Sequence, residues 1–273
     1  MVTLVTMDAD AFRLEGIGFS VPARRGAAGD GQVILRDITL GFPRGKVTAL
    51  LGHNGSGKST LMKIMARQAL PTTGAAFCDG RPLAGYEPRA FARAVAWLPQ
   101  DPGAATDLTV GEVVASGRYP WHGPLGRFTE KDRAAVAGAL ALTGMTDFAD
   151  RSLATLSGGE RQRAWLAMLI AQDSRTLLLD EPTAALDIAH QIEVLSLIRC
   201  LSHHRGLAVV IVMHDVNMAA RFCDLIHALK GGEVIASGPP GEILTPGVLQ
   251  RIYGVAMDVL PWPGHDLPLA AVR

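Results

Sequence analysis

The sequence has few of the features that would place the protein outside the cell or on a nucleic acid. It contains only three cysteines, Cys78, Cys200 and Cys223, which lie far apart and lack the spacing of a metal site. An odd and sparse set of this kind predicts reduced thiols in a cytosolic protein rather than a disulfide framework. Basic and acidic residues both number 26, so no excess of positive charge points to a nucleic-acid partner.

Long apolar runs and a targeting segment are also missing. The longest apolar runs, such as residues 208–213, have the length of a strand, far below the ~20 residues that span a bilayer. Residues 1–8 combine neither a basic segment nor a long apolar core, so we expect no secretory signal there. Any association with a membrane is therefore expected to come through a partner protein.

A glycine-rich loop is the most informative stretch. Its sequence is Gly52-His53-Asn54-Gly55-Ser56-Gly57-Lys58-Ser59-Thr60, and it lies between a predicted strand at 47–51 and a predicted helix that begins near residue 61. This spacing is that of a phosphate-binding P-loop. Glycines let backbone N–H groups curl around phosphate oxygens, and the following helix directs its positive end at the same anion. Lys58 is expected to reach the β- and γ-phosphates, and Ser59 to ligate Mg²⁺. A flexible glycine turn with a surface lysine would leave the order of strand, loop and helix unexplained.

The segments around this loop predict an α/β fold. Residues 12–14 and 33–40 favour an antiparallel β layer, and residues 75–80 favour a hairpin. Residues 95–98 favour a short strand, and residues 176–179 and 208–213 are continuous apolar runs, which is typical of strands buried on both faces of a parallel sheet. The tail predicts a strand at 233–236, a turn at 238–241 and a helix at 248–253.

Residues 101–156 differ from the rest, because alanine-rich helical patterns replace the strands. The residues at 129–132 resemble a capping box that begins a helix extending to residue 142. We therefore predict a P-loop NTPase core with a mainly parallel sheet, an antiparallel β layer and an inserted helical subdomain. The domain covers residues 1–273, with the core at 1–100 and 157–273 and the helical subdomain at 101–156.

Polar residues follow four of the predicted strands, and they are Gly52, Gln100, Asp180 with Glu181, and His214. Ligands of open parallel sheets bind outside the carboxyl ends of the strands, so these residues are expected to meet at one edge. Taken alone, Gln100 fits a turn beside Pro99, and His214 fits a helix cap. A P-loop at the same edge favours a joint site instead.

The carboxylates Asp180 and Glu181 suit two different roles. Asp180 is placed to hold the Mg²⁺ shell, directly or through water. Glu181 is the next residue along and points to the opposite side of the chain, where it can polarise a water for attack on the γ-phosphate. The alternative is an acidic pair that begins a helix at Pro182. The neighbouring P-loop argues against that alternative.

A second candidate anion site is Ser157-Gly158-Gly159, which precedes a predicted amphipathic helix. Serine is a common helix cap, so the stretch is only moderately specific by itself. The P-loop already covers one side of a triphosphate. A second helix terminus is best explained if it approaches the γ-phosphate from the other side.

Taken together, these stretches resemble the nucleotide-binding domain of ABC transporters over almost the whole chain. The matching segments are Walker A at 52–60, the Q-loop at Gln100, the signature at 156–160, Walker B at 177–181, the D-loop at Ala185-Leu186-Asp187 and the H-loop at His214. The resemblance implies a homodimer that encloses two ATP molecules, with each site pairing one chain's Walker A with the other chain's Ser157, Gly158 and Gly159. It also implies Glu181 as the catalytic base, His214 as a γ-phosphate contact and Gln100 as a sensor of Mg²⁺ and of the attacking water. A permease is expected to dock on the helical subdomain.

A narrower resemblance connects the chain to the ATPase subunits of bacterial importers for ferric hydroxamate siderophores. It depends on residues 117–123, 126–128, 167–174 and 186–191. It implies a peripheral protein on the cytoplasmic face of the inner membrane, with a multi-spanning permease and a periplasmic substrate-binding protein as partners. Importers of other ferric siderophores, haem or cobalamin are the alternatives, and the cargo itself is not expected to touch this chain.

One position departs from the family pattern, because Val21 stands where an aromatic residue usually stacks on adenine. Two other functions compete with transport. A non-transport ABC protein usually has two ATPase domains or long coiled coils, whereas this chain has one set of motifs and no heptad run. A P-loop kinase would leave the signature and His214 unexplained.

Overall fold

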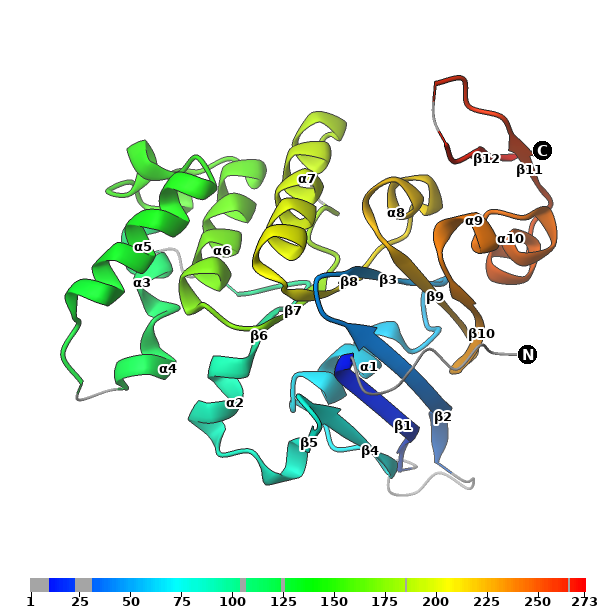
Figure 1. Ribbon diagram of the computed structural model, residues 1–273, viewed down its shortest axis with the longest axis horizontal. Helices are drawn as coiled ribbons and strands as arrows, with labels where there is room; N and C mark the ends of the chain where they lie inside the picture. Colours follow the sequence, from blue (N-terminus) through cyan, green and yellow to red (C-terminus); the bar gives the residue numbers. More distant parts are fainter. Residues whose placement is uncertain (1–9, 23–30, 104–106, 124–125, 185, 265) are drawn as a thin grey trace.

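A six-stranded sheet crosses the middle of the molecule (Figure 1). The computed structural model describes residues 10–22, 31–103, 107–123, 126–184, 186–264 and 266–273. The sheet contains β3 (Val47–Leu51), β6 (Val95–Leu98), β7 (Thr176–Asp180), β8 (Ala208–Val212), β9 (Leu225–Lys230) and β10 (Glu233–Gly238), in the order β10-β9-β3-β8-β7-β6. All pairs are parallel except β10 with β9. The carboxyl ends of the five parallel strands therefore share one edge.

The sheet is covered on both faces, which explains why its central strands are apolar throughout. Every residue of β3, β7 and β8 is buried. Side chains alternate between the faces, so that Ala49 and Leu51 join one hydrophobic core while Leu50 joins the other. A strand that is buried on both sides holds the residues at its carboxyl end in fixed positions.

A second, antiparallel sheet packs against one face of the first through α1 (Lys58–Met65). It contains β1 (Asp10–Val21), β2 (Gln32–Pro43), β4 (Thr73–Cys78) and β5 (Arg81–Pro82), in the order β2-β1-β4-β5. Phe12 and Phe42 from this sheet share a core with Met62 of α1 and Leu50 of β3. The expected antiparallel layer and the hairpin at 75–80 are both confirmed.

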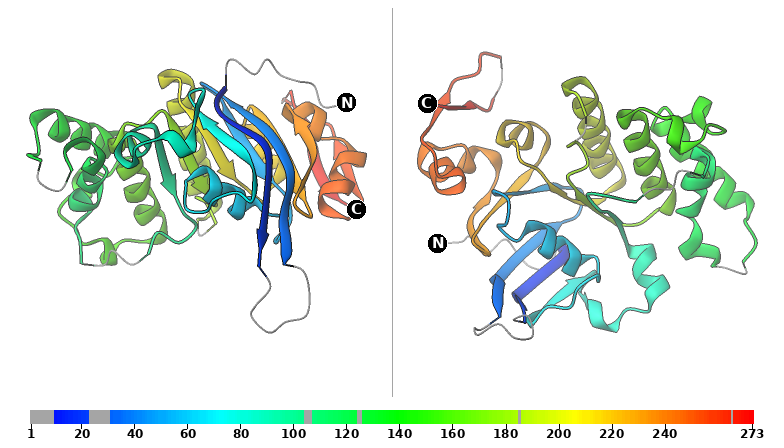
Figure 2. Two further views of the ribbon diagram at one scale, coloured as in Figure 1. Left: turned by 90° about the horizontal axis from the view of Figure 1, so that it is seen from below. Right: turned by 180° about the vertical axis from the view of Figure 1, so that it is seen from behind.

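Helices cover the opposite face and both ends (Figures 1 and 2). The remaining elements are α2 (Pro88–Ala94), α3 (Val110–Ser116), α4 (Tyr119–His122), α5 (Glu130–Leu142), α6 (Gly158–Gln172), α7 (Ile188–Arg205), α8 (Val216–Phe222), α9 (Pro240–Ile243), α10 (Pro246–Tyr253), β11 (Met257–Leu260) and β12 (Leu269–Val272), with short 3-10 turns at Leu83–Gly85, Thr146–Phe148 and Leu153–Thr155. Figure 2 shows the group α3–α6 and the β11–β12 hairpin at opposite ends of the molecule.

The region 101–156 is helical, as expected. Within its described part, residues 101–103, 107–123 and 126–156, the only β pairing is a single bridge between Thr109 and Ser152. The capping box at the start of α5 is present, because the Thr129 N–H donates to Asp132 while the Thr129 hydroxyl oxygen accepts from the Asp132 N–H. Helix α6 packs against α3 and α5, so the helical layer continues into the helix that follows residue 156.

The tail differs from expectation at one turn. Strand β10 continues to Gly238, and α9 begins at Pro240, so the predicted turn at 238–241 is wrong in its second half. Proline is favourable at the first position of a helix, where no N–H is needed, and this effect decided the local structure. Strands β9, β11 and β12 were not predicted either.

Candidate functional site

The P-loop (Gly52–Thr60) leaves the end of β3 and enters α1 through backbone that only glycine adopts readily. Gly52 has a φ of 146° and Gly57 a φ of 100°, and a Cβ on either would collide with Leu229 or Leu35. An added Cβ on Gly55 would meet nothing within 4 Å. The loop is therefore tightly packed on its inner side and open on its outer side, as a cradle for an anion requires.

Lys58 places its ammonium at the centre of this loop. Its Nζ donates hydrogen bonds to the carbonyl oxygens of Gly52, at 2.7 Å, and His53, at 3.0 Å. The side chain is only 5% exposed, and burial lowers its pKa. Ser56 is fully buried beneath it, whereas His53 and Asn54 lie on the exposed side. The P-loop thus presents a buried cation to a ligand that enters from the open side.

Asp180 and Ser59 meet at the entrance to α1. The Ser59 hydroxyl donates to an Asp180 carboxylate oxygen at 3.5 Å, and Thr60 follows in the first turn, half-buried. Burial raises the pKa of Asp180, although Ser59 and Lys58 act in the opposite direction. A nearby cation stabilises a carboxylate most when burial makes its negative charge unfavourable.

This pair suits Mg²⁺, which in nucleotide sites takes one or two protein oxygens and completes its shell with phosphate and water. Among the described residues no group of three or more His, Cys, Asp or Glu side chains is arranged to hold a metal by itself. The oxygens of Ser59 and Asp180 fit an ion that brings a phosphate ligand, and these two residues, with Gln100 at the same sheet edge, would hold it.

Glu181 is bound by the two other polar residues predicted for this edge. Gln100 Nε2 lies 2.9 Å from one carboxylate oxygen of Glu181, and His214 Nε2 lies 2.7 Å from the other. Glu181 has a φ of 53°, in the left-handed region that a side chain of this size rarely adopts. This conformation separates it from Asp180, so the two carboxylates have different neighbours, and backbone strain of this kind is concentrated at functional sites.

His214 is held from the side by the C-terminal region. The Tyr253 hydroxyl of α10 donates to the His214 carbonyl oxygen at 3.1 Å, and burial raises the pKa of Tyr253 to about 12. Asp215, and not His214, caps α8, because its carboxylate accepts from the N–H groups of Asn217 and Met218. The capping alternative for His214 is therefore wrong. Tyr253 was missed because nothing in the sequence connects it to a residue 39 positions away.

Ser157, Gly158 and Gly159 lie at the start of α6, in the helical layer. Ser157 forms a capping box with Glu160, whose carboxylate accepts from the Ser157 N–H at 2.7 Å. That bond lowers the pKa of Glu160. Within the described ranges no hydrogen bond or ion pair joins residues 157–159 to the P-loop, and Figure 1 shows α6 and α1 in different layers. Within the described residues, a single chain therefore does not join the two predicted anion-binding stretches by a bond.

The structure also describes two further predicted features, the D-loop and the position of Val21. Asp187 of the D-loop caps α7, because its carboxylate accepts from the His190 N–H at 3.0 Å. Leu186 is described as well, whereas Ala185 lies outside the described residues. At the end of β1, Val21 is 42% exposed, and Phe19, an aromatic residue on the same strand, packs against the core between the sheets.

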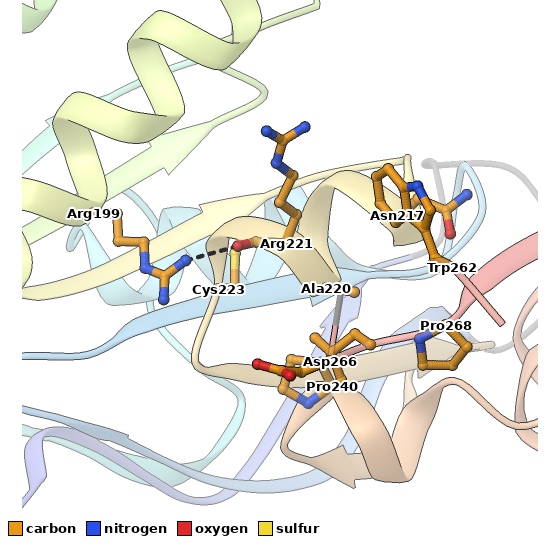
Figure 3. A pocket seen from close by; sticks show the side chains of 10 residues that line it. Arg199, Asn217, Ala220, Arg221, Cys223, Pro240, Trp262, Asp266 and Pro268 are labelled. Atoms are coloured by element: carbon orange, nitrogen blue, oxygen red, sulfur yellow. Dashed lines mark hydrogen bonds between the residues drawn. The ribbon is translucent and has the colours of Figure 1, made fainter. Parts of the chain in front are cut away.

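A separate cavity of about 400 Å³ lies between α7, α8 and the C-terminal region (Figure 3). Arg199 and Arg221 line one side, and Trp262 and Pro268 line the other. The Arg199 guanidinium donates to the Arg221 carbonyl oxygen at 2.8 Å. None of the lining residues belongs to the P-loop or to the Glu181 cluster, so the cavity is distinct from the candidate site.

Comparison with known proteins places this fold and site in a family. The model of the family described as ABC transporter matches residues 35–184, more than half of the chain. The chain belongs to the ABC transporter family.

Two curated relatives and one solved structure are similar to this chain over most of its length. The iron(3+)-hydroxamate import ATP-binding protein FhuC of Bacillus subtilis is 41% identical over 87% of this chain and 88% of its own length. The ferric enterobactin transport ATP-binding protein FepC of Escherichia coli is 42% identical over 86% and 87%. The ATP-binding cassette MJ0796, solved as a dimer bound to ADP and Pi, has a TM-score of 0.73 and 25% identity, and covers 84% of this chain and 98% of its own. The expected α/β ABC ATPase fold is confirmed. Within the described part of the chain, no helix is long and apolar enough to cross a bilayer.

Proposed function

We propose that this chain is the ATP-hydrolysing subunit of an importer and acts as a homodimer with two ATP molecules at the interface. The observation that carries the proposal is the pair of hydrogen bonds from Gln100 and His214 to Glu181, at the sheet edge that also carries the P-loop. The three residues come from three different strand ends, and each has a role that ATP hydrolysis requires. We also propose one domain over 1–273, with core segments 1–100 and 157–273 and the helical subdomain 101–156.

The P-loop and the residues that follow β6, β7 and β8 have different roles in the reaction. The P-loop N–H groups and Lys58 bind the phosphates, while Ser59, Asp180 and Gln100 supply the oxygens that would hold Mg²⁺. When bound, that ion would neutralise phosphate charge. Glu181 accepts a proton from the attacking water, and His214 orients Glu181 and contacts the γ-phosphate. Ser157, Gly158 and Gly159 of the second chain close the site, a role supported by the lack of any hydrogen bond or ion pair to the P-loop of their own chain among the described residues.

The names of the relatives support a cargo and a set of partners. The chain aligns over nearly its full length with proteins named for import of iron(3+)-hydroxamate and ferric enterobactin. We therefore propose a ferric siderophore importer, with ferric hydroxamates as the first candidate, and the haem and cobalamin importers as alternatives. Its partners would be a multi-spanning permease at the bacterial inner membrane, which places this chain peripherally on the cytoplasmic face, and a periplasmic substrate-binding protein. No direct contact with the cargo and no nucleic acid is expected.

Two measurements test this proposal separately. Purified chain should release phosphate from ATP only with Mg²⁺, and no release under any nucleotide and divalent-ion condition would end the ATPase assignment. A deletion strain should lose uptake of radioactive iron supplied as a ferric hydroxamate and regain it with the unsubstituted gene. Normal uptake in the deletion strain, with loss of uptake of haem or cobalamin instead, would favour the alternative cargo.

A further inference from the structure

Trp121 of α4 lies at a junction of three elements. Two guanidinium groups lie over its indole ring, with the central carbon of Arg118 at 4.9 Å and that of Arg93 at 5.1 Å from the ring centroid. Its Nε1 donates to the Gln172 carbonyl oxygen at 2.7 Å. We call Arg93, Arg118, Trp121 and Gln172 the Trp121 junction. Figure 1 shows α4 next to α2, at the edge of the helical layer.

The Trp121 junction provides hydrogen-bond donors for the last carbonyl groups of α6. The last carbonyl groups of a helix have no partner within it. Arg118 Nη1 donates to the Ala171 carbonyl oxygen at 2.8 Å, and Trp121 bonds the next one. Arg118 is buried and also donates to Asp132 in the first turn of α5, at 2.8 Å. A guanidinium next to the negative end of the α6 dipole is a favourable arrangement, and it joins α4, α5 and α6.

The same junction reaches the central sheet. Arg93 of α2 donates from Nε to the Pro120 carbonyl oxygen at 2.9 Å. The Gln172 side chain donates to the carbonyl oxygen of Val95, the first residue of β6, at 3.2 Å. Strand β6 leads to Gln100, and α6 begins at Ser157–Gly159. The junction therefore lies at the far ends of the two elements whose other ends carry candidate site residues.

We propose that Trp121 is a positioning residue that fixes α6 relative to β6, so that a displacement of α4 moves the signature residues and Gln100 together. The proposal rests on the proposed function, in which a permease supplies that displacement. Trp121 is 38% exposed and Tyr119, on the same short helix, is 50% exposed, so α4 offers aromatic surface to a partner while its inner side is bonded to α6.

Hydrogen exchange on the full-length chain separates positioning from local packing. Trp121→Phe keeps an aromatic ring beside the two arginines, removes the donor to Gln172 and makes the ring system smaller. We expect faster exchange at the C-terminal end of α6 and also at the Arg161 amide, which bonds the Ser157 carbonyl oxygen. Helix α6 has 15 residues and spans about 22 Å, so the Arg161 amide is remote from the substitution. Tyr119→Phe is the matched control and should change neither end.

Steady-state hydrolysis by the same two variants provides the second readout. We expect Trp121→Phe to lower kcat by roughly threefold to tenfold at unchanged KM for ATP, because the P-loop is intact while the signature is displaced. Exchange that changes only near residues 170–173, or an unchanged kcat, would overturn the proposal. The exchange measurement needs no hydrolysis and no permease. Failure of this inference is therefore distinguishable from failure of the proposed function, which would appear as an inactive unsubstituted chain.

Discussion

His214 Nε2 lies 2.7 Å from a carboxylate oxygen of Glu181. A carboxylate only accepts hydrogen bonds, so Nε2 carries the proton in the neutral imidazole. The other oxygen of Glu181 accepts from Gln100, while Asp180 next to it accepts from Ser59. The end of β7 therefore carries two adjacent carboxylates with separate partners, one suited to a metal ion and one to a proton.

Glu181→Gln is expected to abolish hydrolysis while ATP stays bound. Glutamine keeps the length of the side chain but does not take a proton from water, and loss of a general base costs about 10²- to 10⁴-fold in rate. The P-loop is unchanged, so the ATP-bound form should accumulate as a dimer that size-exclusion chromatography detects. Hydrolysis near the unsubstituted rate would refute the base assignment. Exclusively monomeric variant with ATP bound would refute the two-chain site.

Lys58→Ala is expected to weaken ATP binding itself. The ammonium is buried and aimed into the P-loop, and loss of a charged hydrogen bond of roughly 1.5–3 kcal/mol predicts about 10- to 100-fold weaker binding. Titration calorimetry with ATP and Mg²⁺ measures this directly. Lys63→Ala is the control, because Lys63 is exposed on the same helix and should leave the Kd unchanged. Equal affinities for the two variants would contradict the phosphate role of Lys58.

The sequence predicted which residues lie at the candidate site better than it predicted the contacts that position them. Gly52, Gln100, Glu181 and His214 each follow an apolar run, and the rule that ligands bind at the carboxyl ends of parallel strands is enough to assign them to one site. Their mutual hydrogen bonds could not be predicted, because they depend on the positive φ of Glu181. Glycine would be the usual signal for such a backbone, and here a glutamate adopts it.

The tail was the least predictable part. Strand β9 contains a histidine and ends in a lysine, so its residues do not form the continuous apolar run of β3 or β8. His227 interrupts the pattern because it bonds Ser237 and Gly41 in the core, which is a tertiary contact without a local signal. The support of His214 by Tyr253 is of the same kind.

Ser157 tests whether a second chain completes the site. Ser157→Arg removes the cap of α6, at a cost of about 1 kcal/mol, and adds bulk. Ser157→Asp keeps a capping oxygen but adds a negative charge, which repels phosphate by roughly 1–4 kcal/mol at a few Å. Both variants should lose at least about tenfold in hydrolysis, since tenfold corresponds to ~1.4 kcal/mol, while ATP affinity of the monomer stays unchanged. Only the Arg variant should melt earlier. Full hydrolysis by the Asp variant would show that the residue is a cap and nothing more.

His227 makes the fold sensitive to acid. Its ring is buried between the sheets, where Nε2 donates to the Gly41 carbonyl oxygen at 3.2 Å and Nδ1 accepts from the Ser237 hydroxyl at 2.8 Å. Burial lowers its pKa to about 4, against an ordinary value of 6.5. As pH falls from about 6.5 to about 4, His227 therefore binds a proton in the unfolded chain but stays neutral in the folded chain. The free energy of unfolding should decrease across this window, by roughly 3 kcal/mol in total from this group.

Urea unfolding at pH 7.5 and pH 5 measures the effect. His227→Gln keeps a neutral polar side chain and removes the titration, so its free energy of unfolding should depend less on pH than that of the unsubstituted chain, whatever its absolute stability. His204→Gln is the matched control, because His204 is exposed at the end of α7 and should leave the pH dependence unchanged. If the His227 variant and the unsubstituted chain lose the same free energy between the two pH values, the buried imidazole is not the source of the acid sensitivity.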